Sequence, residues 1–336
     1  MAGGLPVEEG DALVIATSGS SGRAKGVVLT HDALVASARA TSARLGVEPD
    51  RHTWLACLPL AHVGGLSVVT RAILTGTRLH VLPAFDAERV EALGRSGEAT
   101  HVSLVAAALR RVDPSSFTRI LLGGSRPPGE LPPNAVVTYG LTETGSGVIY
   151  DGVPLDGVEV AIAHFDGGGG AADGAGGAVG DGGGDGGEIL LRAPMLMRCY
   201  RDGTTGRVTG PDRSTTWFAT GDAGFLTATG ALSVTGRIAE MINTGGEKVW
   251  PDEVERVLAT HRGVAEVAVW KRPDPEWGER VVAWVVPAEP PPDVRELKEL
   301  VAGAIAPWAA PKEIVFTTAL PRTASGKVRR SELLEA

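Results

Sequence analysis

Cysteine is scarce in this chain, and long apolar runs are missing. The 336 residues contain two cysteines, Cys57 and Cys199, which lie far apart and have no metal-ligand spacing. This excludes a disulfide framework and fits a reducing compartment, so we expect a cytoplasmic protein. The longest apolar runs, such as residues 278–288, are broken by charge and fall far short of the roughly 20 residues of a membrane span. The segment after Met1 has neither the basic start nor the apolar core of a signal peptide, and none is expected.

The chain also lacks an excess of positive charge. Its 32 Lys and Arg residues are outnumbered by 40 Asp and Glu residues, for a net charge of -8. We therefore expect no general attraction to nucleic acid or to anionic membranes. A content of 43% hydrophobic and 21% charged residues is typical of an ordinary globular protein, and the length is sufficient for two domains.

Short β-rich runs alternate with helical stretches over most of the chain. Residues 12–18 predict a strand, and residues 29–46 predict a helix with Thr30 as N-cap and Gly46 as its end. This alternation predicts a large layered α/β domain with mainly parallel strands. Further strands are expected within residues 53–60, 77–85, 100–105, 119–125 and 135–140.

Two later segments differ from the rest of the chain in their residue pattern. Residues 166–187 are a glycine-rich, low-complexity run between two strand-like pieces, which predicts a long hairpin loop without a catalytic role. From residue 238 the pattern predicts a smaller α+β domain of about 100 residues. We therefore divide the chain into a large domain at 1–237 and a small domain at 238–336. In the small domain, helices are expected at 251–261 and within 291–311, and strands at 264–274 and 279–289.

Several polar runs carry residue types suited to phosphate chemistry. Residues 17–26 follow a strand and read TSGSSGRAKG, in which small residues allow close approach of an anion and Lys25 adds positive charge. The run is not a Walker A loop. At 139–144, Glu143 is flanked by two threonines, an arrangement that suits a hard cation beside phosphates. Asp222, in a predicted turn at 220–222, could accept hydrogen bonds from ribose hydroxyls.

Two further polar runs, residues 236–248 and 321–327, complete a series of five motifs. In their order and spacing the five resemble those of the adenylate-forming superfamily, which includes acyl-CoA synthetases, luciferases and peptide-synthetase adenylation domains. The resemblance extends from about residue 11 to residue 331. The chain departs from the family pattern at Ala24, where proline is usual, and at Ser21, where threonine is common. Both residues are small, so phosphate binding is still expected.

The resemblance implies an ATP and Mg²⁺ site in the large domain. The run from Ser18 to Lys25 would cover the β- and γ-phosphates, Thr142 would touch the α-phosphate and Glu143 would hold Mg²⁺. Tyr139 would stack on adenine. The nucleotide-binding residues implied are Thr17, Ser18, Gly19, Ser20, Ser21, Gly22, Lys25, Gly123, Gly124, Ser125, Tyr139, Gly140, Asp222 and Arg237, the last two at the ribose.

The resemblance also implies an AMP-forming acid–thiol ligase with coenzyme A as second substrate. Lys327 would bridge the attacking carboxylate and the α-phosphate. Gly245 and Gly246 would line the pantetheine tunnel after the small domain swings about a hinge near Ala239, where the family often has Asp or Lys. Thr142, Glu143 and Lys327 are thus the expected catalytic residues.

The clearest indication of the acid is the segment 58–71, LPLAHVGGLSVVTR. It resembles the corresponding segment of the o-succinylbenzoate–CoA ligases of menaquinone biosynthesis, which place a basic residue nine positions after the histidine. Their substrate has two carboxylates, and Arg71 could pair with the one that does not react. Ser103 could add a hydrogen bond, and His62 would line the pocket wall. On the residues alone, Arg71 could equally be a surface residue of an amphipathic helix.

Two other functions remain open on the sequence. One is an acyl- or aryl-CoA synthetase for a different acid. The other is a non-catalytic nucleotide-binding relic, which the complete set Lys25, Glu143, Asp222, Arg237 and Lys327 argues against. The phosphate loop begins near residue 17, whereas most of the superfamily carries a substantial segment before it. A short form with exposed edges favours a homodimer.

Overall fold

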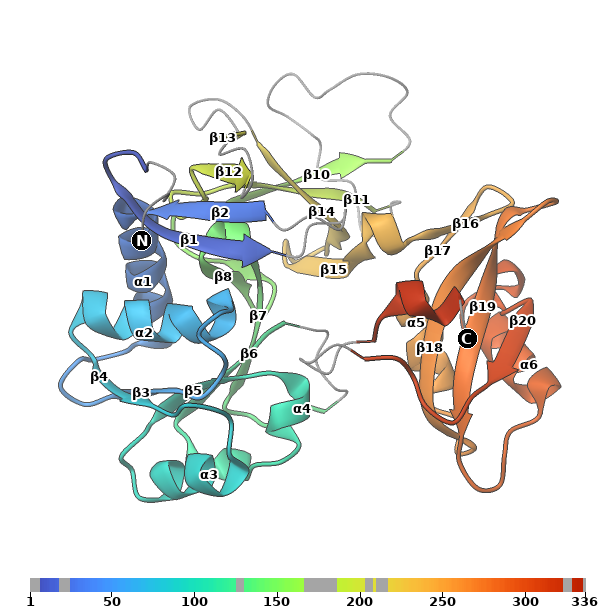
Figure 1. Cartoon of the computed structure of the whole chain (residues 1–336), viewed down its shortest axis with the longest axis horizontal. Helices are drawn as coiled ribbons and strands as arrows, with labels where there is room; N and C mark the ends of the chain where they lie inside the picture. The colour runs from blue at the N-terminus through green and yellow to red at the C-terminus, as the bar shows by residue number, and fades with distance from the viewer. Residues whose placement is uncertain are drawn as a thin grey trace, which may run out of the picture. The chain divides into compact units, whose positions relative to one another are not determined.

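A computed structural model describes residues 7–17, 25–124, 130–165, 186–202, 208–209, 217–322 and 328–334. The chain forms two compact units, Met1–Thr220 with Phe225–Ser233, and Gly221–Gly224 with Val234–Ala336 (Figure 1). The boundary passes through two strands, so each of them contributes to both units. The domain division at residue 237 stays a prediction. In the described part of the chain, no helix has the length and apolar character to cross a membrane.

The first unit is built on a seven-stranded sheet in the order β4-β3-β5-β6-β7-β8-β9. Neighbouring strands are parallel from β4 to β7, and β8 and β9 are antiparallel additions. The expected α/β fold with parallel strands is confirmed for this sheet. Its strands are β3 (Thr53–Ala56), β4 (Arg78–Val81), β5 (His101–Leu104), β6 (Arg119–Leu122), β7 (Ala135–Leu141), β8 (Ser146–Tyr150) and β9 (Val153–Pro154).

Helices cover both faces of this sheet. Trp54 and Leu55 are consecutive in β3, so their side chains point to opposite faces. Trp54 meets Arg71 of α2, whereas Leu55 belongs to a buried cluster with Val90 of α3. Burial on both faces explains why the inner strands β3 and β6 are mostly apolar. The helices are α1 (His31–Leu45), α2 (Val63–Thr75), α3 (Ala87–Arg95) and α4 (Ala106–Leu109), with a 3₁₀ turn at Pro114–Ser116.

Helix α1 confirms the predicted caps but begins later than expected. The Thr30 hydroxyl accepts a hydrogen bond from the Ala33 N–H at 3.2 Å, and Gly46 ends the helix at φ 62°. Leu29 instead belongs to β2 (Lys25–Thr30), which pairs antiparallel with β1 (Asp11–Thr17). The first predicted strand is therefore not part of the parallel sheet. It forms a separate sheet in the order β1-β2-β12-β13, with β12 (Cys199–Asp202) and β13 (Val208–Thr209).

A third sheet has the order β10-β11-β14-β15. The predicted hairpin is present, since β10 and β11 are antiparallel with Ile162 opposite Ile189. The predicted loop, residues 166–187, extends into β11, because Gly187 pairs with His164. Residues 166–185 lie outside the described part. The strands are β10 (Glu159–His164), β11 (Gly187–Arg192), β14 (Phe218–Leu226) and β15 (Leu232–Arg237).

Replacing residues 167–185 with a short Gly-Ser turn should leave activity within about twofold of wild type, because the free energy of closing a loop changes only slowly with its length. The hairpin is held by the six-residue register of β10 and β11 and not by the loop. Acid-dependent pyrophosphate release measures the result. A large loss of activity in a folded variant would reveal a role for this run.

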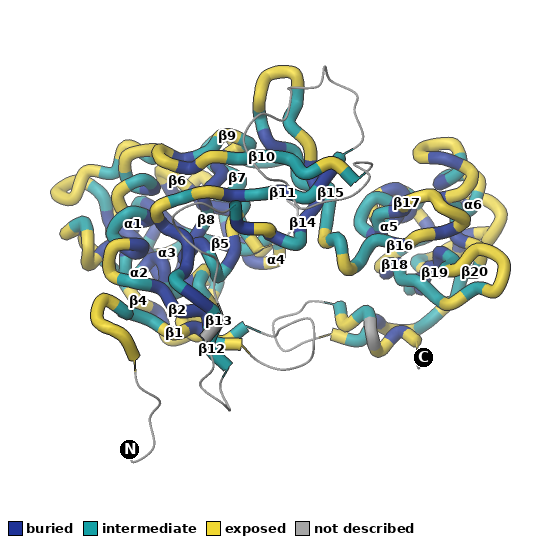
Figure 2. Tube along the Cα trace, turned by 90° about the horizontal axis from the view of Figure 1, so that it is seen from above, coloured by how far each residue is buried: buried dark blue, intermediate teal, exposed yellow. Residues whose placement is uncertain are grey.

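The second unit is a small α+β unit. β19 lies between β16 and β18, with β17 beyond β16, and β20 pairs with β19 in parallel. Residues 281–285 of β19 are fully buried, which makes this strand the centre of the core (Figure 2). Both expected helices and both expected strands are present. The elements are β16 (Ile242–Thr244), β17 (Glu247–Val249), α5 (Pro251–Leu258), β18 (Val264–Asp274), β19 (Gly278–Pro287), α6 (Val294–Ala304), β20 (Glu313–Phe316) and 3₁₀ turns at Ile238–Glu240, Pro307–Ala309 and Arg330–Leu334.

Candidate active site

The predicted phosphate loop connects β1 to β2. Thr17 ends β1 and Lys25 begins β2, and the two residues are register partners. The Thr17 hydroxyl donates to the Lys25 carbonyl at 3.4 Å. The hairpin thus brings the two ends of the run together. The predicted ligands between them, Ser18, Gly19, Ser20, Ser21 and Gly22, lie outside the described residues.

The predicted cation site lies in a tight turn after β7. Thr142–Thr144 form one 3₁₀ turn that closes at Gly145 with φ 67°. The Leu141 N–H donates to the Thr144 hydroxyl at 2.9 Å, and that hydroxyl lies 2.7 Å from the Ser146 carbonyl oxygen that it can donate to. The buried Thr144 side chain therefore stabilises the turn through its hydrogen bonds. Thr142 and Glu143 are half-buried. The turn presents one carboxylate and one hydroxyl, both hard oxygen donors.

Tyr200 joins this turn to the strand of Lys25, a contact that sequence analysis missed. The Tyr200 hydroxyl donates to Glu143 Oε1 at 2.8 Å. The Lys25 ammonium lies over the Tyr200 ring, 5.4 Å from its centroid. Because β12 pairs with β2, residues far apart in the chain become neighbours here. The only hint in the sequence is a tyrosine in a short β-rich run.

The predicted adenine segment lies at the carboxyl ends of β6 and β7. These strands are parallel neighbours, and ligands of α/β sheets bind at such ends. Gly123 and Gly140 are required by close packing, because an added Cβ would lie 2.7 Å from the Thr138 hydroxyl and 2.2 Å from the Ser146 carbonyl oxygen, respectively. Gly124 has φ 82°, and Tyr139 is half-buried in β7. Ser125 lies outside the described residues.

Arg71 is buried, which contradicts its reading as a surface arginine. Its exposed fraction is 2%, and its guanidinium carbon lies 4.6 Å from the Trp54 ring centroid. Nη2 donates to the Ser146 hydroxyl at 3.0 Å, but in the described part of the chain Nε and Nη1 have no acceptor and no carboxylate pairs with this cation. Burial lowers the pKa of Arg71 from its ordinary value. A buried cation with two unmet N–H groups is a strong site for an anion.

The other two predicted substrate residues, His62 and Ser103, lie at the start of α2 and in β5. His62 is the exposed N-cap residue of α2, about 13 Å along the helix from Arg71 at 1.5 Å per residue. Ser103 is half-buried in β5. His101, beside it in β5, is kept neutral because burial lowers its pKa to about 4.

Cys57 is too deeply buried to act as a nucleophile. Burial raises the pKa of the Cys57 thiol to about 12. The thiol is therefore protonated at neutral pH, and only a thiolate is an effective nucleophile. Neither cysteine forms a disulfide, and both are buried.

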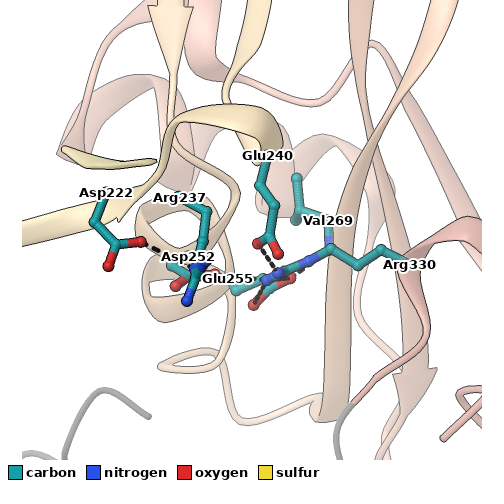
Figure 3. A network of polar contacts seen from close by, with 7 residues as sticks. All are labelled: Asp222, Arg237, Glu240, Asp252, Glu255, Val269 and Arg330. Atoms are coloured by element: carbon teal, nitrogen blue, oxygen red, sulfur yellow. Dashed lines mark hydrogen bonds and ion pairs between the residues drawn. The ribbon is translucent and has the colours of Figure 1, made fainter. Parts of the chain in front are cut away.

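In the second unit, Asp222 and Arg237, the two residues expected at the ribose, form an ion pair with each other (Figure 3). Arg237 Nε lies 2.9 Å from Asp222 Oδ1. The Asp222 side chain is buried, whereas that of Arg237 is 57% exposed. The predicted turn at 220–222 is wrong, because these residues lie inside β14. The Thr220 hydroxyl donates to the Ile189 carbonyl at 2.7 Å, so pairing with β11 overrides the local turn signal of Gly221.

Arg330 binds three carboxylates that the sequence did not connect (Figure 3). Its guanidinium contacts Glu240 of the 3₁₀ turn, Asp252 at 2.5 Å and Glu255 at 3.0 Å, the last two from α5. Arg330 follows the predicted catalytic Lys327, which lies outside the described residues. Val328 forms an antiparallel β-bridge with Arg322. The residues on either side of the run 323–327, which contains Lys327, therefore belong to the same unit.

The stability of the second unit should fall as pH rises through the pKa of Glu255. Burial raises this pKa from 4.5 to about 6, against the opposing effect of Arg330. The folded chain then holds a proton that the unfolded chain has lost, so the stabilisation is complete below pH 4.5 and disappears above pH 6. Between pH 5 and pH 8 the loss should be about 1 kcal/mol.

Urea unfolding of wild type and Glu255→Gln at both pH values tests this expectation. Tryptophan fluorescence reports mainly on this unit, because five of the seven tryptophans lie at 250–308. The variant should lose less stability than wild type on going to pH 8. Parallel losses would show that Glu255 does not titrate in this range.

Gly245 and Gly246 lie beside a hollow of about 600 Å³. Ala239, Gly246, Lys271 and Trp277 are among its lining residues. Gly245 has φ 62°, and an added Cβ would lie 2.4 Å from the Trp277 ring, so this backbone requires glycine. The sequence placed a pantetheine path at these glycines, and that assignment stays a prediction.

Comparison with known proteins now assigns the class. The family of AMP-binding enzymes matches residues 5–201, and the AMP-binding enzyme C-terminal domain matches residues 253–327. The chain belongs to the AMP-binding enzyme family. The predicted family and the two-part α/β fold are therefore confirmed.

Particular relatives share one activity in their names. A probable 2-succinylbenzoate–CoA ligase of Mycobacterium tuberculosis is 36% identical over 98% of this chain and 86% of its own length. The o-succinylbenzoate CoA synthetase of Bacillus subtilis, solved with the acyl-adenylate OSB-AMP, has a TM-score of 0.81 at 29% identity, over 96% of this chain and 69% of that one. The same enzyme solved with ATP and a magnesium ion has a TM-score of 0.77 at 28% identity, with the same coverage.

Proposed function

We propose that this chain is an ATP-dependent, AMP-forming ligase that joins o-succinylbenzoate to coenzyme A. The observation that carries the proposal is the buried, incompletely paired Arg71, in a chain similar over nearly its whole length to ligases of that name. Thr142, Glu143, Asp222 and Arg237 are among the described residues assigned to the nucleotide.

In the first half-reaction, a carboxylate oxygen of the acid attacks the α-phosphorus of ATP and pyrophosphate leaves. Anions approach each other in this step, so positive charge must offset the repulsion. Lys327 and Lys25 would supply part of that charge, and the N–H and hydroxyl groups of residues 17–22 would bind the outer phosphates. Asp222 would accept hydrogen bonds from the ribose.

The donor set of the Glu143 turn fits Mg²⁺. Within the described residues no group of three or more His, Cys, Asp or Glu could hold a metal by itself. Mg²⁺ is commonly held by one or two carboxylates together with substrate phosphates, and Glu143 with Thr142 offers that arrangement. The ion would neutralise phosphate charge during the first half-reaction.

In the second half-reaction, the thiol of coenzyme A attacks the acyl carbon of the acyl-AMP. The thioester bond forms, the acyl–phosphate bond breaks and AMP leaves with the electron pair. Gly246, which lines the hollow and has open space where a side chain would be, would leave room for a narrow pantetheine chain, and Gly245 would hold the turn beside it. No cysteine of this chain is needed as a nucleophile.

Arg71 would set the choice of acid. The second carboxylate of o-succinylbenzoate would accept a charge-assisted hydrogen bond from the unmet Nη1–H group. Because Arg71 is only 2% exposed, the packing around α2 must open when the acid enters. Ser103 would contribute a hydrogen bond, and His62 would line the wall nearer the surface.

A panel of carboxylic acids tests the proposal. Pyrophosphate release should require o-succinylbenzoate, and thioester should form when coenzyme A is added. Release with another acid would make the chain a different acyl- or aryl-CoA synthetase. The absence of release with every acid would indicate a nucleotide-binding relic.

We also propose a cytoplasmic location and a homodimer. Two buried cysteines that form no disulfide fit a reducing compartment. The exposed Ile73 of α2 and Val81 of the edge strand β4 support self-association. Light scattering at several concentrations tests the dimer.

A further inference from the structure

Tyr200 occupies a position between the two charged groups assigned to the triphosphate. In the β2–β12 pair, Tyr200 lies opposite Val27, and Lys25 is the diagonal neighbour two residues along β2. Residues at i and i+2 of a strand share one face, so Lys25 and Tyr200 lie side by side. This explains the ammonium 5.4 Å from the ring centroid. Lys25 itself is exposed, and the ring is the surface against which it lies.

Residues in β12 and just before it also hold Glu143 at two points. The Met197 N–H, just before β12, donates to the Glu143 carbonyl at 2.6 Å, which locates the backbone of the turn. The Tyr200 hydroxyl donates to Oε1 at 2.8 Å, which selects the orientation of the side chain. The bond uses Oε1 and leaves Oε2 free of Tyr200. Without it, a glutamate in a half-buried turn would sample several rotamers.

We propose that Tyr200 is a positioning residue that orients the Glu143 carboxylate for Mg²⁺ and the Lys25 ammonium for the phosphates of ATP. The proposal rests on the proposed function. Carboxylates that bind a metal depend on hydrogen bonds from neighbouring groups, and losing such a partner commonly weakens metal binding by 10- to 100-fold. The ring acts separately, because a cation over an aromatic face is held electrostatically. One side chain thus organises two charges of opposite sign.

Two substitutions separate the two actions. Tyr200→Phe removes the hydroxyl and keeps the ring under Lys25, whereas Tyr200→Leu removes both. Tyr150→Phe is the matched control, because it also removes one tyrosine hydroxyl from the same unit, that bonded to Thr41 at 3.1 Å. Glu143→Gln is the reference for loss of the carboxylate.

The first measurement is Mn²⁺ binding followed by electron paramagnetic resonance, with a non-hydrolysable ATP analogue present. The second is the Mg²⁺ concentration for half-maximal pyrophosphate release. Tyr200→Phe should weaken Mn²⁺ binding and raise the Mg²⁺ requirement about tenfold, with kcat at saturating Mg²⁺ close to wild type. Tyr200→Leu should in addition raise the KM for ATP roughly two- to fivefold. Tyr150→Phe should leave the Mg²⁺ requirement unchanged.

The outcomes separate this role from the proposed function. If Glu143→Gln weakens Mn²⁺ binding but Tyr200→Phe does not, the role of Tyr200 is wrong and the metal site stands. If Glu143→Gln binds Mn²⁺ like wild type, Glu143 is not the metal ligand and that assignment fails. An equal shift in Tyr150→Phe would show a general effect of weakened packing, which also overturns the role of Tyr200.

Discussion

Arg71→Ala is expected to lower kcat/KM for o-succinylbenzoate by roughly 30- to 1,000-fold. The buried guanidinium has two N–H groups without an acceptor in the described part of the chain, and a carboxylate that binds there would gain charge-assisted hydrogen bonds in a desolvated place. Losing such a contact costs on the order of 2–4 kcal/mol. Most of the effect should appear as a higher KM for the acid, measured by pyrophosphate release.

Three comparisons separate recognition of the acid from damage to the fold. The KM for ATP should barely change, because Arg71 is in no nucleotide motif. Arg71→Lys should recover only part of the loss, since an ammonium cannot reproduce the planar arrangement of donors that a guanidinium offers both to the acid and to Ser146. Any monocarboxylic acid that is turned over should be insensitive. Wild-type kinetics in Arg71→Ala would remove both the contact and the main reason for preferring this acid, whereas equal losses for all acids would indicate a packing defect over Trp54.

Lys327→Ala should reduce formation of the acyl-adenylate by about 100- to 1,000-fold, as expected for removing a group that stabilises developing charge. In that step a carboxylate approaches a phosphate, so loss of the cation raises the activation free energy of this step. Transfer of a pre-made acyl-AMP to coenzyme A should stay close to wild type. There the thiol attacks a carbonyl carbon, and no further anion approaches the α-phosphorus. Rapid-quench measurements of the two half-reactions give the two rates.

Arg329→Ala is the matched control for this experiment. It removes a cation two residues away, whose side chain is 47% exposed and pairs with Glu332 at 2.6 Å. Exposed pairs of this kind contribute little to stability, so both half-reactions should remain near wild type. Equal losses in the two half-reactions of Lys327→Ala would contradict the division of labour proposed for this lysine.

Local chemistry made much of the fold predictable from the amino-acid sequence. The ends of α1 follow from Thr30 and Gly46, because a cap depends on residues within one helical turn. The parallel sheet follows from the alternation of apolar runs with helical stretches. The family likewise follows from the order of five short motifs, since each is a contiguous run whose residue types suit one part of a nucleotide.

Contacts between segments far apart in the chain determined the features that could not be predicted from the sequence. Residues 220–222 have the composition of a turn, yet pairing with β11 makes them part of a strand. Arg71 could have been a surface residue until the packing of α2 on Trp54 buried it. The contact of Tyr200 with Glu143 depends on β12 pairing with β2, and that of Arg330 with Glu240 depends on folding of the whole second unit. The physical reason is that local propensities act over one or two turns of chain, whereas burial and strand pairing depend on which distant segments fold together.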